Sequence, residues 1–202
     1  MSEITNWALA WQKITAPRRY TYHGLEKYGK GSQHYFRGRL CVLDSLASAA
    51  GVQEIDAPFV HERVYQMSRP LIPMADYFRI MGLPSSEKLK ITKKDLVRDW
   101  RNIQKLYRRI RGLGGSILGN ALQKYTFDFN HIPSSQIPEF VRYSSHEVIV
   151  TGIIQIKTEF GSHAFHAKTD PRGQLRSISE RGKLLKMYPD TQAMMVSLLP
   201  KS

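Results

Sequence analysis

The sequence predicts an α+β protein with a helix-rich N-terminal half, an antiparallel β-meander and a short C-terminal helix. Two patterns predict this class. Apolar residues recur every three or four positions in the first half. β-branched residues are frequent after residue 147 and alternate with polar ones from Ile153 onward. The 202 residues, 42% of them hydrophobic, suit a single compact domain. We divide it into an N-terminal amphipathic helix (1–17), a basic aromatic segment (18–39), a helical part (40–125), a β part (126–180) and a C-terminal segment (181–202).

The N-terminal segment is predicted as a short amphipathic helix that Pro17 ends. Trp7 and Trp11 lie on its apolar stripe, which we expect to contact the core or a partner because exposed indole rings are unfavourable. Helices that lie on a membrane surface usually carry several cations on their polar face. Lys13 is the one cation before Pro17, so insertion into lipid is the weaker alternative.

Segment 18–39 interleaves aromatic residues with arginines and lysines. Cations contact phosphates, and aromatic rings stack on unpaired bases at about 1–3 kcal/mol per base. Its aromatic order does not match the RRM signature, and no KH-type loop stands in its expected fold context, so sequence-specific recognition is not expected. The candidate nucleic-acid contacts are Arg18, Arg19, Tyr20, Tyr22, Lys27, Lys30, Arg37 and Arg39.

Apolar spacing predicts further helices over 40–50, which Gly51 ends, and over 56–69 and 74–82. Residues 34–40 fit a strand leading into the first of them equally well. Cys41, the single cysteine, forms no internal disulfide, and its apolar neighbours favour a buried structural thiol over a reactive one.

The clearest helix runs from Thr92 to Arg111. An apolar stripe that includes Trp100 lies opposite a stripe of cations, and these candidate nucleic-acid contacts are Lys94, Arg98, Arg101, Lys105 and Arg108. Replacing the last four by Gln is expected to leave folding nearly unchanged and to weaken polyanion binding. Replacing Trp100 by Ala is expected to cost about 3–5 kcal/mol of stability.

In the second half of the chain, the spacing of apolar residues changes from helical to strand-like. Residues 147–179 are predicted as an antiparallel meander, with a bulge at Gly152 as one option and a tight turn from Asp170 to Gly173. Asp190 is predicted to cap a last helix over 191–199.

No motif of catalysis or nucleotide binding is present in the sequence. The glycines of 111–120 lack the Lys-Ser or Lys-Thr of a P-loop, and the dinucleotide pattern fails at Ile117. His163 and His166 face opposite sides of a strand, so they do not converge on a metal. We expect no enzyme activity, no cofactor and no metal, and an enzyme that processes nucleic acid is the least favoured alternative.

The charge balance indicates a polyanionic partner, because 30 Lys and Arg stand against 17 Asp and Glu for a net charge of +13. We expect a basic structural protein that binds RNA or a ribonucleoprotein within a larger assembly. In size, charge and lack of enzyme motifs the chain is similar to components of viral nucleocapsids, matrix layers and ribosomes.

The alternative is a peripheral-membrane protein of the matrix type, which binds anionic lipid and self-associates. The sequence shows no signal peptide and no apolar run of membrane-spanning length. An intracellular location, cytoplasmic or nuclear, is therefore expected.

Overall fold

The computed structural model describes residues 21–22, 40–55, 93–112, 114–156, 159–187 and 192–202. The predicted helices over 1–17, 56–69 and 74–82 lie outside these residues. So does the basic aromatic segment, apart from two residues.

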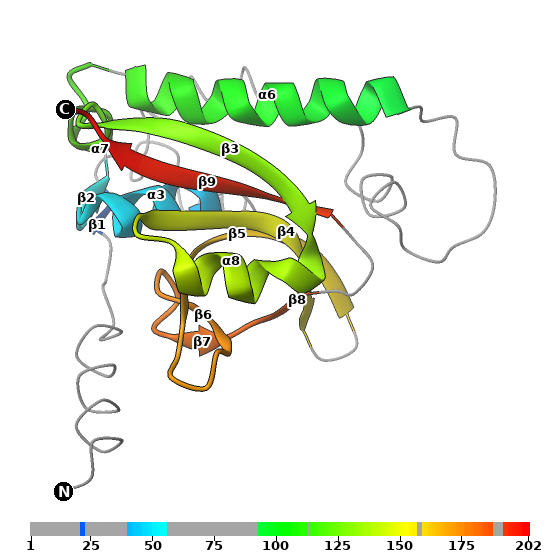
Figure 1. The fold of residues 1–202 in the computed structure, drawn as a ribbon. Helices are drawn as coiled ribbons and strands as arrows, with labels where there is room; N and C mark the ends of the chain where they lie inside the picture. Colours follow the sequence, from blue (N-terminus) through cyan, green and yellow to red (C-terminus); the bar gives the residue numbers. More distant parts are fainter. Residues whose placement is uncertain (1–20, 23–39, 56–92, 113, 157–158, 188–191) are drawn as a thin grey trace, which may run out of the picture.

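An antiparallel sheet organises the described part of the chain (Figure 1). Its strand order is β3-β9-β4-β5-β6-β7, and β8 also pairs with β4. The strands are β3 (Tyr125–Pro133), β4 (Glu147–Ile156), β5 (Glu159–Thr169), β6 (Leu175–Ser177), β7 (Lys183–Leu184), β8 (Lys186–Met187) and β9 (Gln192–Pro200). A separate parallel pair joins β1 (Thr21–Tyr22) to β2 (Glu54–Ile55). The α+β class predicted from the sequence is confirmed.

Helices cover both faces of the sheet. On one face lie α3 (Leu40–Ala50), α6 (Lys93–Gly112) and α7 (Ile117–Leu122), and α6 runs alongside β3 and β9 (Figure 1). On the other face lies α8 (Ile137–Tyr143), preceded by the short 3-10 turn η2 (Ser134–Gln136). Pro138 in the first turn of α8 suits a helix start, although the sequence analysis did not predict this helix.

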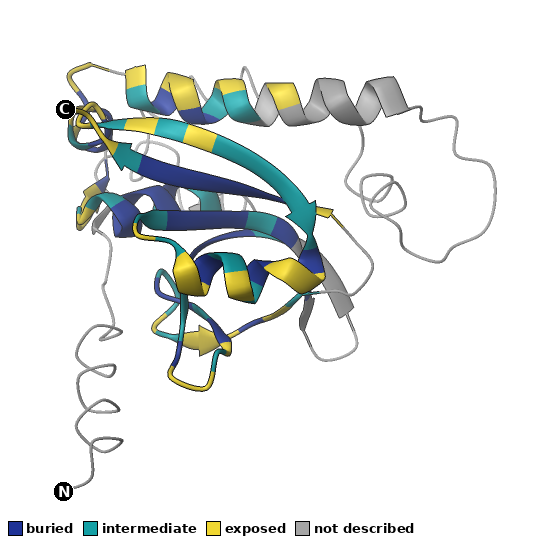
Figure 2. Ribbon diagram, viewed as in Figure 1, coloured by how far each residue is buried: buried dark blue, intermediate teal, exposed yellow. Residues whose placement is uncertain are grey.

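Each face has its own hydrophobic core, and alternation along the strands divides residues between them. In β4, Ile149 packs toward α3, α6 and α7, while Val148 and Val150 pack toward α8. The residues of β9 alternate in the same way, and Met194 and Val196 pack on the face covered by α3, α6 and α7. Both strands are therefore buried on both faces, as the continuous dark colour of β9 shows (Figure 2).

The prediction of a helix over 191–199 is wrong, because Gln192–Pro200 forms β9, the strand between β3 and β4. A strand that is buried on both faces carries an unbroken apolar run instead of alternating polar residues, and such a run does not distinguish strand from helix. Here the run is AMMVSLL, in which Ser197 is the one polar residue, and burial extends from Ala193 to Leu198.

The predicted meander is confirmed, since β4 pairs with β5 and β5 with β6, all antiparallel. The β4–β5 register continues through Gly152, which pairs with His163 without a bulge. The predicted turn lies between β5 and β6. There the buried Asp170 carboxylate accepts hydrogen bonds from the backbone N–H groups of Arg172 and Gln174 at 3.0 and 2.9 Å.

The predicted helices over 40–50 and 92–111 also form, as α3 and α6. Gly51, which follows α3, has a φ of +72°, the left-handed conformation that glycine adopts most readily. Within the described residues, no helix combines the length and the apolar character needed to cross a bilayer.

Candidate nucleic-acid interface

Helix α6 presents a row of cations to solvent, which we call the α6 basic strip. Its members are Arg101, Lys105, Arg108 and Arg109, all exposed. On the other side of the helix, Tyr107 and Ile110 are fully buried in the core. Among the described residues, no acidic side chain forms an ion pair with any cation of the strip. Within the described part of the chain, the charge of the strip is therefore not neutralised.

Aromatic residues of β3 pack against the buried side of α6. The Tyr107 ring packs edge-on against Phe127 and Phe129, with centroid distances of 6.0 and 6.2 Å. The guanidinium group of Arg108 lies 5.1 Å from the Phe129 centroid, and that of Arg111 lies 5.4 Å from Phe127. Arg111 also donates to the Tyr125 carbonyl oxygen at 3.2 Å. Stacking on the rings restrains these two arginines without neutralising them.

The structure brings together part of the predicted contact set. Arg101, Lys105 and Arg108 lie exposed on one helix, as expected. Lys94, Arg98 and Trp100 belong to α6, but their side chains lie outside the described residues. Tyr22 has a described backbone, which pairs with Ile55 in the small parallel sheet. The remaining predicted contacts lie outside the described residues: Trp7, Trp11, Arg18, Arg19, Tyr20, Lys27, Lys30, Arg37 and Arg39.

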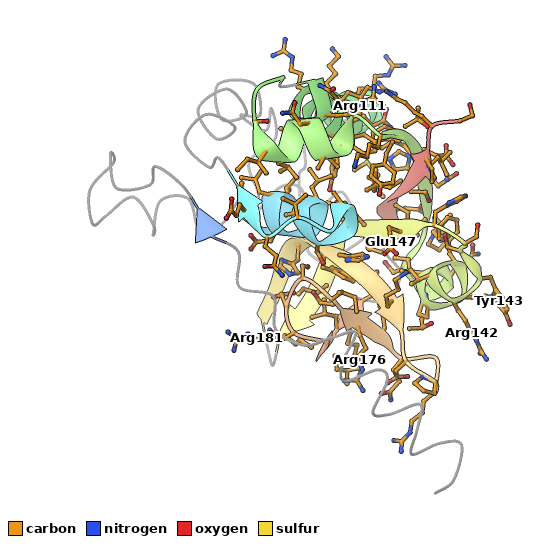
Figure 3. The ribbon with its side chains drawn as sticks, turned by 90° about the vertical axis from the view of Figure 1, so that its left-hand side faces the viewer. Arg111, Arg142, Tyr143, Glu147, Arg176 and Arg181 are labelled. Atoms are coloured by element: carbon orange, nitrogen blue, oxygen red, sulfur yellow. The ribbon has the colours of Figure 1, made fainter. Side chains whose placement is uncertain are left out.

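A second group of cations lies on the opposite side of the sheet from α6. Figure 3 shows Arg176 and Arg181 on that side, away from Arg111. Arg176 is neutralised by Asp170 at 2.9 Å, and its pairing helps to lower the pKa of that carboxyl group. Arg181, Lys183 and Lys186 are exposed. Because these exposed cations lie outside α6, variants that lack them can be compared with variants that lack the cations of the α6 basic strip.

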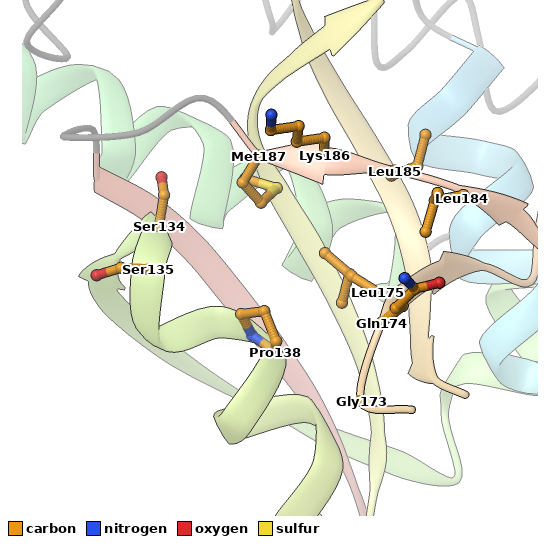
Figure 4. Close-up of a pocket in the computed structure, with 10 residues that line it drawn as sticks. All are labelled: Ser134, Ser135, Pro138, Gly173, Gln174, Leu175, Leu184, Leu185, Lys186 and Met187. Carbon is orange, nitrogen blue, oxygen red and sulfur yellow. The ribbon is translucent and has the colours of Figure 1, made fainter. Parts of the chain in front are cut away.

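A groove of about 450 Å³ opens between α8 and the β6–β8 region (Figure 4). Its walls are mainly apolar, from Pro138, Leu175, Leu184 and Met187. Among the described residues that line it, Lys186 is the one ionisable residue. The described part of the lining is therefore mainly a hydrophobic surface.

A layer of polar side chains lies between α3 and the sheet, buried at Ser48 and His166 and partly exposed at Glu147 and Lys168. Ser48 Oγ lies 2.7 Å from His166 Nδ1, and His166 Nε2 bonds to the Glu147 carboxylate, which also pairs with Lys168 at 3.1 Å. Burial alone would raise the pKa of Glu147, but the hydrogen bonds and charges of His166 and Lys168 outweigh it and lower the pKa to about 2. This network ties α3 to β4 and β5.

A second chain of polar groups lies at the start of α3. His163 Nε2 lies 2.7 Å from Glu180 Oε2. Burial alone would lower the pKa of His163, but the influence of the Cys41 and Glu180 side chains outweighs it and raises the pKa to about 9. Burial and the charge of Glu180 raise the pKa of Asp44 to about 7, and the charge of His163 opposes this rise. Asp44 Oδ1 is buried and has no hydrogen-bond partner among the residues that the structure describes.

Neither group of linked polar side chains was predicted from the sequence. Ser48 was interpreted as a small packing residue, and Asp44 was not among the candidate residues. The available signal was the spacing of Cys41, Asp44 and Ser48, which places three polar side chains on one face of an apolar helix. His163 and His166 bind different carboxylates, and within the described part of the chain no three acidic, His or Cys residues are arranged to hold a metal ion.

Comparison with models of protein families finds no match to this chain, and comparison with curated protein sequences finds no relative.

Proposed function

We propose that the protein binds RNA or a ribonucleoprotein through the α6 basic strip, as a structural component of a larger assembly. The observation that carries the proposal is the strip itself. Four exposed cations lie on one helix without acidic partners among the described residues. Multiple cations bind polyanions by releasing counterions from the phosphates, which makes affinity depend on salt.

The surroundings of the strip support phosphate contact more than base recognition. The Phe127 and Phe129 rings are half-buried beneath Arg111 and Arg108, so they hold guanidinium groups in place and are not free platforms for bases. Backbone contact of this kind is independent of sequence. The segment 18–39, which carries further cations and aromatics, is proposed as a second contact region.

The test replaces Arg101, Lys105 and Arg108 together by Gln and measures affinity for single-stranded RNA at several salt concentrations. Each phosphate contact to a single strand contributes about 0.7 to the slope of log affinity against log salt, so losing three contacts should reduce the slope by about 2. Folding should change little, because exposed charges contribute little and the Arg108 stacking about 0.5–1 kcal/mol.

A matched control replaces Lys183, Lys186 and Lys201, which are exposed outside α6, by Gln. This variant loses the same net charge, so it measures the effect of charge alone. The proposal is wrong if both variants lose the same amount of affinity, or if the α6 variant binds RNA with the salt slope of the parent.

Anionic lipid is the alternative polyanion. Flotation with liposomes that contain phosphatidylserine, with and without competing RNA, separates the two partners. Flotation that RNA does not displace, combined with weak RNA binding, would favour the peripheral-membrane function.

A further inference from the structure

The groove between α8 and the β6–β8 region, which we call the α8 groove, plays no part in the proposed function. Its volume of about 450 Å³ lies within the range of about 300–1,000 Å³ that is typical of sites for small molecules. Figure 4 shows Pro138 of α8 on one side of the groove and Leu175 and Leu184 on the other. An apolar chain can therefore lie between the helix and the strands.

One apolar residue of the α8 groove remains widely exposed to water. Leu184 retains 51% of its surface, whereas Leu175 and Leu185 are 3% and 5% exposed. A single exposed leucine is common on protein surfaces, but this one borders a groove that a ligand can fill. Met187 is only partly buried, and its unbranched thioether can adapt to the shape of a ligand. A ligand that covers Leu184 removes apolar surface from water, which is favourable.

A single cation, Lys186, lines the described part of the α8 groove. It is exposed, and no acidic side chain among the described residues forms an ion pair with it. Two arginines near the groove are already engaged, since Arg176 has a carboxylate partner at 2.9 Å and Arg142 lies 5.7 Å from the Tyr143 ring centroid. Within the described part of the chain, the groove thus combines apolar walls with one unpaired positive charge.

We propose that the α8 groove binds a free fatty acid, whose hydrocarbon chain covers Leu184 and whose carboxylate lies at Lys186. Sites for small molecules are mostly apolar, with a few polar groups that fix the orientation of the ligand. A molecule with one apolar chain and one anionic end matches this division, and the volume suits one chain better than the two chains of a phospholipid. The inference is independent of the proposed RNA binding, because the described lining contains no residue of the α6 basic strip.

A series of ligands tests both halves of this match. Calorimetry on the full chain compares decanoate with decyltrimethylammonium, which has the same chain length and the opposite charge. One decanoate should bind per protein, at least about threefold more tightly than the cationic ligand. Lengthening octanoate to decanoate should raise affinity by up to about fourfold per added methylene, and acetate should not compete. Equal affinity for both charges, or affinity that does not depend on chain length, overturns the proposal.

NMR spectra of methyl groups locate the bound ligand. The signals of Leu184, Leu185 and Met187 should shift when decanoate is added, because these residues line the groove. The signals of Leu118 and Leu122, which are buried on the other face of the sheet, should not change. Shifts on both faces, or several decanoate molecules per protein, would show general coating by the amphiphile and would overturn the proposal.

Three variants test the assigned residues. Lys186→Gln should weaken decanoate binding about two- to fivefold and remove most of the preference over the cationic ligand. The matched control Lys183→Gln removes an exposed cation of β7 that is not among the lining residues, and it should leave affinity unchanged. Leu184→Ala should weaken both ligands alike. All three residues are exposed, so folding should be retained. Equal effects of the two lysine variants, or no effect of Leu184→Ala, would contradict the assignment.

Other occupants of the α8 groove give different results. Vesicles of phosphatidylserine that shift the same three methyl signals, while decanoate does not, would assign the groove to bilayer lipid. A dimer of the parent that Leu184→Ala dissociates, measured by sedimentation, would assign it to a second copy of the chain. Either result overturns the proposal of a free fatty acid. Loss of RNA binding in the variant of the α6 basic strip bears only on the proposed function.

Discussion

Gly152 in the middle of β4 offers the sharpest stability test of the fold. A Cβ atom at this position would lie 2.7 Å from Met187 Cε and 2.9 Å from Ala193 Cβ. Carbon atoms in normal contact are about 3.5–4.0 Å apart, so alanine would overlap with both neighbours. The Met187 methyl ends a flexible side chain and can move. Ala193 Cβ is attached directly to the β9 backbone and cannot move alone.

Gly152→Ala should therefore displace β9 or leave a strained contact. Overpacking of this kind costs about 1–3 kcal/mol, and we expect the upper half of that range because one obstacle is backbone-anchored. Urea unfolding followed by circular dichroism measures the loss as a lower midpoint with an unchanged slope.

Two second-site substitutions show whether Met187 or Ala193 causes the loss of stability. Adding Met187→Ala to Gly152→Ala should recover less than half of the loss, because the Ala193 contact remains. Adding Ala193→Gly moves the methyl group from one strand to the other, so the double variant should be more stable than the sum of the single changes predicts. A cost of Gly152→Ala below about 0.5 kcal/mol, without rescue by Ala193→Gly, would refute the placement of β9 beside Gly152.

Three further predictions concern polar groups that are wholly or partly buried. The pKa of Asp44 is raised to about 7 in the folded protein, so its ionised carboxylate destabilises the fold as pH rises from about 4 to above 7. The free energy of unfolding of Asp44→Asn, relative to that of the parent, should therefore increase by roughly 2–4 kcal/mol between pH 4 and pH 8. Urea unfolding at the two pH values measures this difference. The pKa of Glu147 is lowered to about 2, so its contribution is full above about 4.5 and disappears as pH falls toward 2. In Glu147→Gln, the loss of stability on acidification should be smaller than in the parent by about 1 kcal/mol, a value reduced to allow for the partial exposure of the carboxylate. Tyr107→Phe removes the hydroxyl group 3.2 Å from Thr151 Oγ1 and should cost about 1 kcal/mol by thermal unfolding, and a neutral effect would mean that this bond contributes nothing.

Local periodicity predicted the elements with one buried face. In α6, buried Tyr107 and Ile110 alternate with exposed cations at helical spacing, so the helix and its basic side could both be read from the sequence. The Asp170 turn was equally local, since its proline and glycine lie within four residues. β9 was misread because burial on both faces removes the alternation that distinguishes a strand.

The polar layer could not be predicted because its bonds join residues far apart in the chain. Ser48 and His166 belong to different elements, and only the packing of α3 on β5 brings them within 2.7 Å. The same holds for His163 and Glu180, which lie 17 positions apart in the sequence and are joined at 2.7 Å in the fold.

The position of β9 has a consequence for how the protein folds. β9 lies between β3 and β4, yet both strands precede it in the chain, with Tyr125 opposite Pro200 and Thr151 opposite Met194. The β4–β5 hairpin and the helices can form from local contacts, whereas β9 must close long loops before it gains any pairing. We therefore expect insertion of β9 to be a late and slow step. Until it occurs, β3 and β4 have unpaired edges and Met194, Met195 and Val196 are unburied, so self-association competes with folding in this interval.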